Sequence, residues 1–159
     1  MIRCHFNLNG GQLSVLSCPG IGFFSAYSGN KGIHRNNPAS VAIPKRGPLP
    51  PGKYYIVTRA RGGWNTRLND FFKSIDSGSD RDIWFALFRE DERIDDSTFI
   101  ENVQRGSFRL HPAGRNGNSD GCITLASASD YMILWRALIT LPSIMITGQL
   151  RAFGTIQVY

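Results

Sequence analysis

A histidine and a cysteine stand at the two ends of a loop-like run in the second half of the chain, FRLHPAGRNGNSDGCITL from Phe108 to Leu125. Between His111 and Cys122 the chain is almost entirely Gly, Asn, Ser, Pro, Asp and Arg. A cysteine is a nucleophile only as a thiolate, and its usual pKa of about 8.5 leaves little thiolate at neutral pH. A nearby imidazole lowers that pKa and can carry the proton to a leaving group. The pair therefore predicts nucleophilic catalysis by a thiol.

The residues next to the cysteine fit the same chemistry. Gly121 directly precedes Cys122 and lets the backbone approach a substrate carbonyl closely. The backbone N–H groups of these two residues are natural donors for an oxyanion hole. The competing interpretation is a surface histidine and a small buried cysteine without a catalytic role, since Cys is often a core residue. The close order of Ser119, Gly121 and Cys122 after a polar Gly/Asn run favours the catalytic interpretation.

Four of these residues resemble the L,D-transpeptidase catalytic motif, His–x(7)–Ser–x–Gly–Cys. Ser119 lies eight positions after His111, and Cys122 lies three positions after Ser119. Upstream, the segments YSGNKGIHRNNP and GPLPPGKYYI resemble the type VI secretion L,D-transpeptidase effectors, a branch of the same superfamily. The resemblance covers most of the chain from Tyr27 to the helix predicted after Cys122.

This resemblance implies cysteine-dependent acyl transfer on the tetrapeptide stems of peptidoglycan, with no cofactor or metal. Cys122 would attack the carbonyl of the third stem residue, a diamino acid, and the terminal D-alanine would leave. The acyl group would pass to water, to a D-amino acid or to the amine of a second stem, and the sequence leaves these acceptors open. His111 would be the general base and acid, and Ser119 would order the loop. Gly121 with Cys122 would supply the oxyanion hole.

The effector branch also implies a place of action and partners. Such an antibacterial effector is injected by a secretion machine and acts in the periplasm of a rival bacterium. The first residues, MIRCHFNLNG, lack the apolar segment of a signal peptide, so we expect synthesis as a soluble cytoplasmic chain. A cognate immunity protein and contacts with secretion-machine components are expected as partners.

Two positions depart from the pattern of many wall-resident members of the superfamily. Those members carry Arg or His between the Ser and the Gly, and Arg two residues after the Cys, where this chain has Asp120 and Thr124. The substrate contacts of those side chains therefore cannot be transferred to this chain. The candidates for substrate binding here are Arg109, Arg115, Asp120, His34 and Asn36.

The composition favours a single domain over residues 1–159 with a mainly β fold and one or two short helices. The 17 Gly and 8 Pro favour turns and short strands, and 42% hydrophobic residues are enough for a packed core. The resemblance narrows this class to the sandwich or barrel domain of the L,D-transpeptidases. The net charge of +6 suits an anionic partner, but the Arg residues are scattered, which argues against nucleic acid. No apolar stretch approaches the ~20 residues of a membrane span, so no membrane insertion is expected.

The predicted elements place the motif between strands and a helix. Alternating apolar residues around the NGG turn predict a hairpin over 2–18, followed by a strand over 21–27. The long irregular segment over 27–54 is typical of a functional loop. Further strands are predicted over 53–60, 82–90, 107–111, 122–125 and 149–159. The segment 66–75 fits a short helix.

The strongest helix signal follows the motif. Ser127, Ser129 or Asp130 can cap this helix, and Pro142 ends it. Its apolar residues recur with a helical period and form one stripe. The members of the stripe are Tyr131, Leu134, Trp135, Leu138 and Ile139.

The number and spacing of the cysteines limit which disulfide or metal site the chain can form. There are 3 of them, an odd number, so a monomer holds at least one free thiol. The absence of a CxxC pair argues against a structural zinc site. Folding the first hairpin brings Cys4 opposite residue 17 or 18, so a disulfide to Cys18 is geometrically possible. Two small buried thiols are the alternative, and the sequence leaves both open.

Two other functions compete with the acyl-transfer hypothesis. A non-catalytic binding module for an anionic polymer such as cell wall would use the basic surface and the long loop, and predicts no reactive thiol. A papain-like cysteine hydrolase is disfavoured, because such enzymes place the Cys before the His in the chain, with a helix starting at the Cys.

Overall fold

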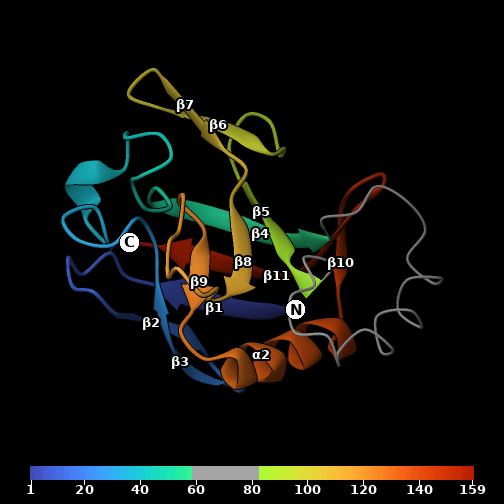
Figure 1. The fold of residues 1–159 in the computed structure, drawn as a ribbon. Coiled ribbons are helices and arrows are strands. Elements are labelled where there is room, and N and C mark those ends of the chain that lie inside the picture. Colours follow the sequence, from blue (N-terminus) through green and yellow to red (C-terminus); the bar gives the residue numbers. More distant parts are fainter. Residues whose placement is uncertain (59–82) are drawn as a thin grey trace.

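The hairpin predicted at the start of the chain is the first part of a closed β-barrel (Figure 1). The computed structural model describes residues 1–58 and 83–159. Strands β1 (Ile2–Phe6) and β2 (Ser14–Cys18) pair antiparallel, and β3 (Gly22–Tyr27) continues the meander. Buried and exposed residues alternate along β1, because successive side chains of a strand point to opposite faces.

The barrel closes because the last strand returns to the first. The strand order is β1–β2–β3–β9–β8–β5–β4–β11, and β11 pairs with β1 in parallel. The remaining strands of the ring are β4 (Gly52–Thr58), β5 (Phe85–Arg89), β8 (Arg109–Pro112), β9 (Ile123–Leu125) and β11 (Leu150–Val158). The short strand β10 (Ile144–Thr147) pairs with the beginning of β11. The predicted mainly β class and its barrel form are therefore confirmed.

One hairpin stands outside the barrel and was not predicted. Strands β6 (Ser97–Ile100) and β7 (Val103–Gly106) form a separate sheet, which projects beyond one end of the barrel at the top of Figure 1. Its turn residues Glu101 and Asn102 both adopt positive φ, 49° and 64°. Two-residue hairpin turns of this kind usually contain an Asn-Gly or Asp-Gly pair, which can be recognised in the sequence. The sequence has no such pair here, which is why this hairpin escapes prediction.

Helix α2 (Ala128–Thr140) lies at the opposite end of the barrel, at the bottom of Figure 1. Ser127 caps it by accepting a hydrogen bond from the backbone N–H of Asp130, as one of the predicted caps. Four members of the predicted stripe are buried in the core, and Ile139 packs against it. The Tyr131 hydroxyl donates to the carbonyl of Leu110 at 3.1 Å, which fixes the helix to β8.

The long segment between β3 and β4 contains one short 3-10 turn, Pro38–Ser40. The helix considered over 66–75 lies outside the described residues. Within residues 1–58 and 83–159, no helix has both the length and the apolar composition that crossing a membrane requires.

A disulfide joins the first two strands. Cys4 on β1 and Cys18 on β2 are bonded in the structure, with both side chains buried in the barrel core. The register of the hairpin explains the pair, because His5 opposes Ser17 and so sets Cys4 opposite Cys18. Cys122 is the free cysteine. Of the two possibilities that the sequence left open for Cys4 and Cys18, the structure has the bonded one.

We expect the double variant Cys4→Ala, Cys18→Ala to be less stable but still active. A crosslink between residues 14 positions apart closes a small loop, and removing such a disulfide costs about 3 kcal/mol of unfolding free energy. Urea unfolding followed by circular dichroism measures the difference. Wild-type protein treated with reductant is the matched control and should shift in the same direction. Equal midpoints for the bonded and the double-variant proteins would contradict a stabilising role.

Candidate active site

The two ends of the motif meet at neighbouring parallel strands, with His111 on β8 and Cys122 directly before β9. β8 and β9 pair so that Leu110 is beside Ile123 and His111 is beside Thr124. Leu110 and Ile123 are fully buried members of the barrel core. Because side chains alternate along a strand, His111, Thr124 and Cys122 therefore face out of the barrel on one common surface. The Gly-rich loop thus returns Cys122 to the strand beside His111.

The His111 ring is held in its neutral form, with the proton on Nδ1. Its Nδ1 lies 2.8 Å from the carbonyl oxygen of Pro112, which can only accept, so Nδ1 carries the proton. Its Nε2 is then the basic nitrogen, and it lies 3.3 Å from the hydroxyl of Thr124. Trp84 stacks on the ring, with the ring centroids 4.2 Å apart. The side chain is 7% exposed, and this burial lowers the pKa of His111 despite the Pro112 hydrogen bond.

The Cys122 thiol is protonated in the resting structure. It is 9% exposed, and burial raises its pKa to about 11. The backbone N–H and the guanidinium of Arg109 lower this pKa, while the carboxylates of Asp120 and Asp96 raise it. The expected lowering of this pKa by the imidazole is not found, because His111 is not among the groups that shift it and burial outweighs the lowering by Arg109. A nucleophilic role of this thiol would therefore require proton transfer to a base.

Cys122 opens onto a cavity with a basic wall. The cavity has a volume of about 540 Å³. Its lining residues are Pro44, Lys45, Trp84, Gln104, Arg105, Gly106, Ser107, Arg109, Asp120 and Cys122. Three of these are basic and one is acidic, so the cavity suits an anionic ligand such as a peptide carboxylate.

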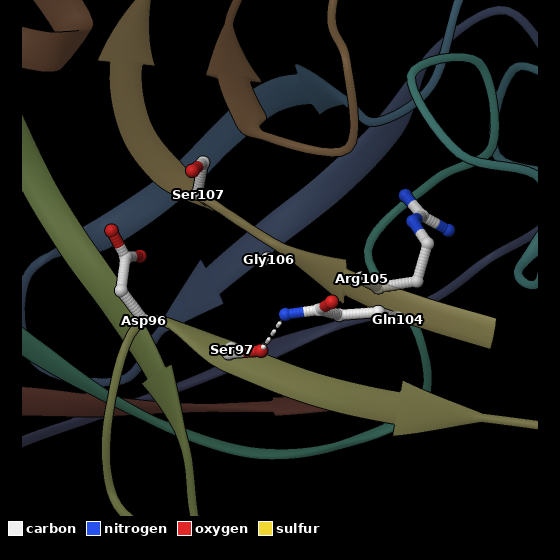
Figure 2. Close-up of a pocket in the computed structure, with 6 residues that line it drawn as sticks. All are labelled: Asp96, Ser97, Gln104, Arg105, Gly106 and Ser107. Atoms are coloured by element: carbon white, nitrogen blue, oxygen red, sulfur yellow. Dashed lines mark hydrogen bonds between the residues drawn. The ribbon is translucent and has the colours of Figure 1, made fainter. Parts of the chain in front are cut away.

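The β6–β7 hairpin supplies one wall of this cavity. A second hollow of about 260 Å³ lies on the same hairpin, lined by Asp96, Ser97, Gln104, Arg105, Gly106 and Ser107 (Figure 2). The segment 104–107 lines both spaces. Figure 2 shows the Gln104 amide turned toward Ser97, to whose hydroxyl it donates at 2.9 Å. An element that the sequence analysis missed therefore shapes the surroundings of Cys122.

Arg105 connects the hairpin, the long loop and the cysteine turn. Its guanidinium points away from the Ser97–Gln104 pair (Figure 2) and donates to the carbonyls of Val41, Gly47 and Pro48. Gly121 lies against the same guanidinium, since a Cβ added there would be 2.7 Å from Arg105 Nη2. The φ of Gly121 is +104°, a conformation that favours glycine. The glycine before Cys122 is therefore required by both space and backbone conformation.

Arg109 and Lys45 present the other positive charges. Arg109 donates two hydrogen bonds to the carboxylate of Asp96, at 2.6 and 2.7 Å, and this contact raises its pKa. Lys45 is exposed at the cavity, and its carbonyl accepts a hydrogen bond of 3.2 Å from the Asn30 side chain. The guanidinium donors of Arg105 and Arg109 are thus engaged within the protein. Lys45 is the cavity-lining cation best placed to meet a ligand.

The loop between the strands is tied down at two points. The Ser119 hydroxyl is buried and donates to the carbonyl of Cys122 at 2.7 Å, which agrees with a loop-ordering role. The carbonyl of Gly117 accepts a hydrogen bond from Arg35, whose guanidinium stacks on Tyr27 at 4.0 Å. Arg115 is exposed on this loop and is not among the residues that line the cavity.

Two predicted substrate-binding residues lie in the long loop, apart from the cavity lining. His34 Nδ1 lies 3.0 Å from the Ser40 hydroxyl. Asn36 is fully buried, accepts from the backbone N–H of Ser28 and donates to the carbonyl of Gly11, each at 2.8 Å. The structure therefore brings Arg109 and Asp120 to Cys122, but not His34 and Asn36.

Several residues of the site had no signal in the sequence. Lys45 and Trp84 reach the cavity from segments far from the motif, and Arg105 reaches it from the β6–β7 hairpin, which was not predicted. Trp84 reaches His111 because Phe85 on β5 pairs with Leu110 on β8, which sets the preceding residue beside the histidine. Such contacts depend on strand register, which short-range patterns do not give.

A comparison with protein families finds one match that spans most of the chain. Residues 22–149 match the family model of the Tlde1 domain, a range that includes β3, the long loop, the motif and α2. None of the curated proteins and none of the solved structures matches the chain at a significant level. The family match covers well over half of the chain. The chain therefore belongs to the Tlde1 domain family, the type VI secretion L,D-transpeptidase effectors.

Proposed function

We propose that this protein is a cysteine-dependent acyl transferase that acts on the tetrapeptide stems of peptidoglycan. The observation that carries the proposal is the placement of a neutral His111 on β8 and of Cys122 directly before the adjacent strand β9, on one face of the sheet beside a basic cavity. The Tlde1 family supports a peptidoglycan target and L,D-transpeptidase-like activity.

The first half-reaction forms a thioester. The thiol proton of Cys122 passes to Nε2 of His111, which is the nitrogen with the lone pair. The sulfur attacks the carbonyl carbon of the third stem residue, and a tetrahedral intermediate forms. The carbon–nitrogen bond to the terminal D-alanine then breaks, and the imidazolium returns its proton to the leaving amine. The products are free D-alanine and an acyl-enzyme.

Backbone donors stabilise the intermediate. The N–H groups of Gly121 and Cys122 are the proposed oxyanion donors, because they belong to the turn that carries the thiol. Ser119 holds the carbonyl of Cys122 and so fixes the direction of this turn. In the second half-reaction the acceptor is water, a D-amino acid or the amine of a second stem. His111 Nε2 removes the acceptor's proton, and the thiol is released.

In this proposal, the positively charged residues of the cavity bind the carboxylates of the substrate. A tetrapeptide stem ends in a carboxylate close to the bond that breaks. Lys45 lies on the cavity wall with an exposed side chain, and Arg109 lies beside the thiol. We assign Lys45 as the residue that meets a stem carboxylate, and Arg109 and Asp120 as neighbours of the reacting bond.

We expect Lys45→Met to raise KM for tetrapeptide stems about fivefold, with little change in kcat, because an ion pair at an exposed site is worth about 1 kcal/mol. The difference from wild type should shrink at high salt, which screens exposed charges. Lys31→Met, at an exposed lysine outside the cavity lining, is the matched control. A KM that is unchanged in Lys45→Met, or raised equally in both variants, would remove Lys45 from the substrate site.

The family also supports a place of action. We propose that the protein is a secreted antibacterial effector, which reaches the periplasm of a target cell and meets peptidoglycan there. A cognate immunity protein and components of the secretion machine are the proposed partners.

Mass spectrometry of muropeptides incubated with the purified protein tests the proposed reaction. The expected products are tripeptide stems, stems with an exchanged terminal D-amino acid, or new crosslinks between third residues. Binding of cell wall without any change in the muropeptides would instead favour a non-catalytic binding module.

A further inference from the structure

Thr124 is a fully buried polar residue at the centre of the site. It is 0% exposed and lies between His111 on β8 and Tyr27 on β3 in the sheet register. Its hydroxyl is 3.3 Å from Nε2 of His111, the nitrogen that the proposed mechanism uses as the base. Cys122 lies two residues earlier on the same outward face. A valine would fill the same space without a hydroxyl, so the presence of a buried hydroxyl here needs an explanation.

A hydroxyl can serve both protonation states of the ring. In the resting, neutral ring it donates to the lone pair of Nε2, and its O–H turns away when the thiol proton is delivered to that lone pair. Its oxygen accepts from Nε2–H once the ring has taken the proton. The opposite edge of the ring is fixed in both states, because Nδ1–H donates to the Pro112 carbonyl throughout. The indole of Trp84 covers one ring face. Together these contacts leave the ring one orientation, with Nε2 directed toward β9.

We propose that Thr124 is a positioning residue for the His111 base: its hydroxyl keeps Nε2 directed toward the β9 side, where Cys122 lies, before and after proton transfer. The proposal rests on the assignment of Cys122 and His111 as nucleophile and base. The burial of the hydroxyl supports it, because a buried hydroxyl without a partner is costly and His111 Nε2 is the partner that the structure gives it.

Other charged or titratable groups lie on the strands around the Thr124–His111 contact, but none of them takes the place of the Thr124 hydroxyl. Arg109 lies two residues before His111 on β8, and its guanidinium is bonded to Asp96. Cys122 precedes β9, and Tyr27 on β3 is stacked under Arg35. None of these side chains is altered by a substitution at position 124. A change in the titration of His111 can therefore be assigned to the hydroxyl.

The test compares Thr124→Val, which keeps the shape and removes the hydroxyl, with Thr124→Ser, which keeps the hydroxyl. NMR of the ring nitrogens gives the tautomer and the titration of His111 in the intact protein. The chain has 3 histidines, so the ring signals of His5 and His34 are internal controls that should not differ among the proteins. Turnover of tetrapeptide stems is measured in parallel, with circular dichroism to confirm folding.

In Thr124→Val we expect turnover to fall about tenfold, the effect of losing one such hydrogen bond. The pKa of His111 should fall further, because hydrogen bonds to a charged ring are stronger than those to a neutral one. Thr124→Ser should restore most of both. Wild-type turnover and ring titration in Thr124→Val would overturn the proposal, as would a Thr124→Ser protein impaired equally to Thr124→Val. If wild-type protein processed no stem, the proposed function would fail, while the ring titration would still decide the Thr124 contact.

Discussion

Replacing Cys122 with alanine should abolish turnover of tetrapeptide stems and leave the barrel folded. Alanine is smaller than cysteine and fits the same buried place without a new polar group. The thiol is the group that forms the acyl-enzyme in the proposed mechanism, so its loss removes the reaction path rather than slowing it. The measurement is muropeptide analysis by mass spectrometry after long incubation, with wild-type protein in parallel.

The double variant Cys4→Ala, Cys18→Ala is the matched control, because it removes both other cysteines from the chain and leaves Cys122 in place. Under conditions in which it remains folded, the double variant should process stems at close to the wild-type rate. A Cys122→Ala protein that processed stems as fast as wild type would refute the thiol mechanism.

The Cys122→Ala variant also distinguishes, in cells, toxicity caused by catalysis from toxicity caused by binding alone. We expect wild-type protein fused to a cleavable export signal to cause lysis, and the exported Cys122→Ala protein to be harmless. Growth curves of cells that express each protein, with and without the signal, give the answer. Killing by exported Cys122→Ala would favour the binding-module alternative. Strong killing by unexported wild-type protein would point to a target outside the periplasm.

His111→Gln should lower kcat/KM for stems by about 10² to 10⁴, the usual contribution of a general acid–base group. Glutamine can keep hydrogen bonds to Pro112 and Thr124, but its amide cannot take up the thiol proton. Because the pKa of Cys122 is about 11, little thiolate forms at pH 7 without such a base. The residual rate should therefore rise steeply with pH in the variant.

The pH profile of the wild-type enzyme gives an independent check. Burial lowers the pKa of His111, so the imidazole stays neutral to a pH below its ordinary value of about 6.5. The rate should fall only when the pH drops through that lowered pKa, since the protonated ring cannot accept the thiol proton. The acidic limb of the wild-type profile should thus have its midpoint below about 6.5. In His111→Gln this limb should be replaced by a rate that keeps rising toward the pKa of the Cys122 thiol, about 11. A variant that kept both the rate and the acidic limb of wild type would exclude His111 as the base.

Much of the framework could be read from short-range sequence patterns. The alternation around the NGG turn predicts β1, β2 and β3, and the capped apolar stripe predicts α2. The spacing of His111, Ser119, Gly121 and Cys122 indicates the L,D-transpeptidase superfamily, and the segments YSGNKGIHRNNP and GPLPPGKYYI indicate the effector branch to which the family match assigns the chain. These features are local, because turn chemistry, strand alternation and helical period act over a few residues.

The β6–β7 hairpin is an element that local sequence patterns do not predict. Its turn at Glu101 and Asn102 adopts positive φ without glycine, so the usual turn signal is missing. The hairpin nevertheless forms one wall of the cavity, and Arg105 on β7 reaches across to the long loop and to Gly121. Nothing near Arg105 in the sequence indicates these partners, which lie more than 50 positions away for the loop carbonyls.

By itself, the sequence determined which residues can act as nucleophile and base, and that the loop between them is flanked by strands. The tertiary structure alone decided their surroundings. Barrel register sets Trp84 and Thr124 on either side of His111, and it sets Cys4 opposite Cys18. Burial, which depends on every packed neighbour, leaves Cys122 a thiol at rest and His111 a neutral base. The physical reason is that register and burial arise from contacts between distant segments, and a shift of one residue would turn each of these side chains to the other face.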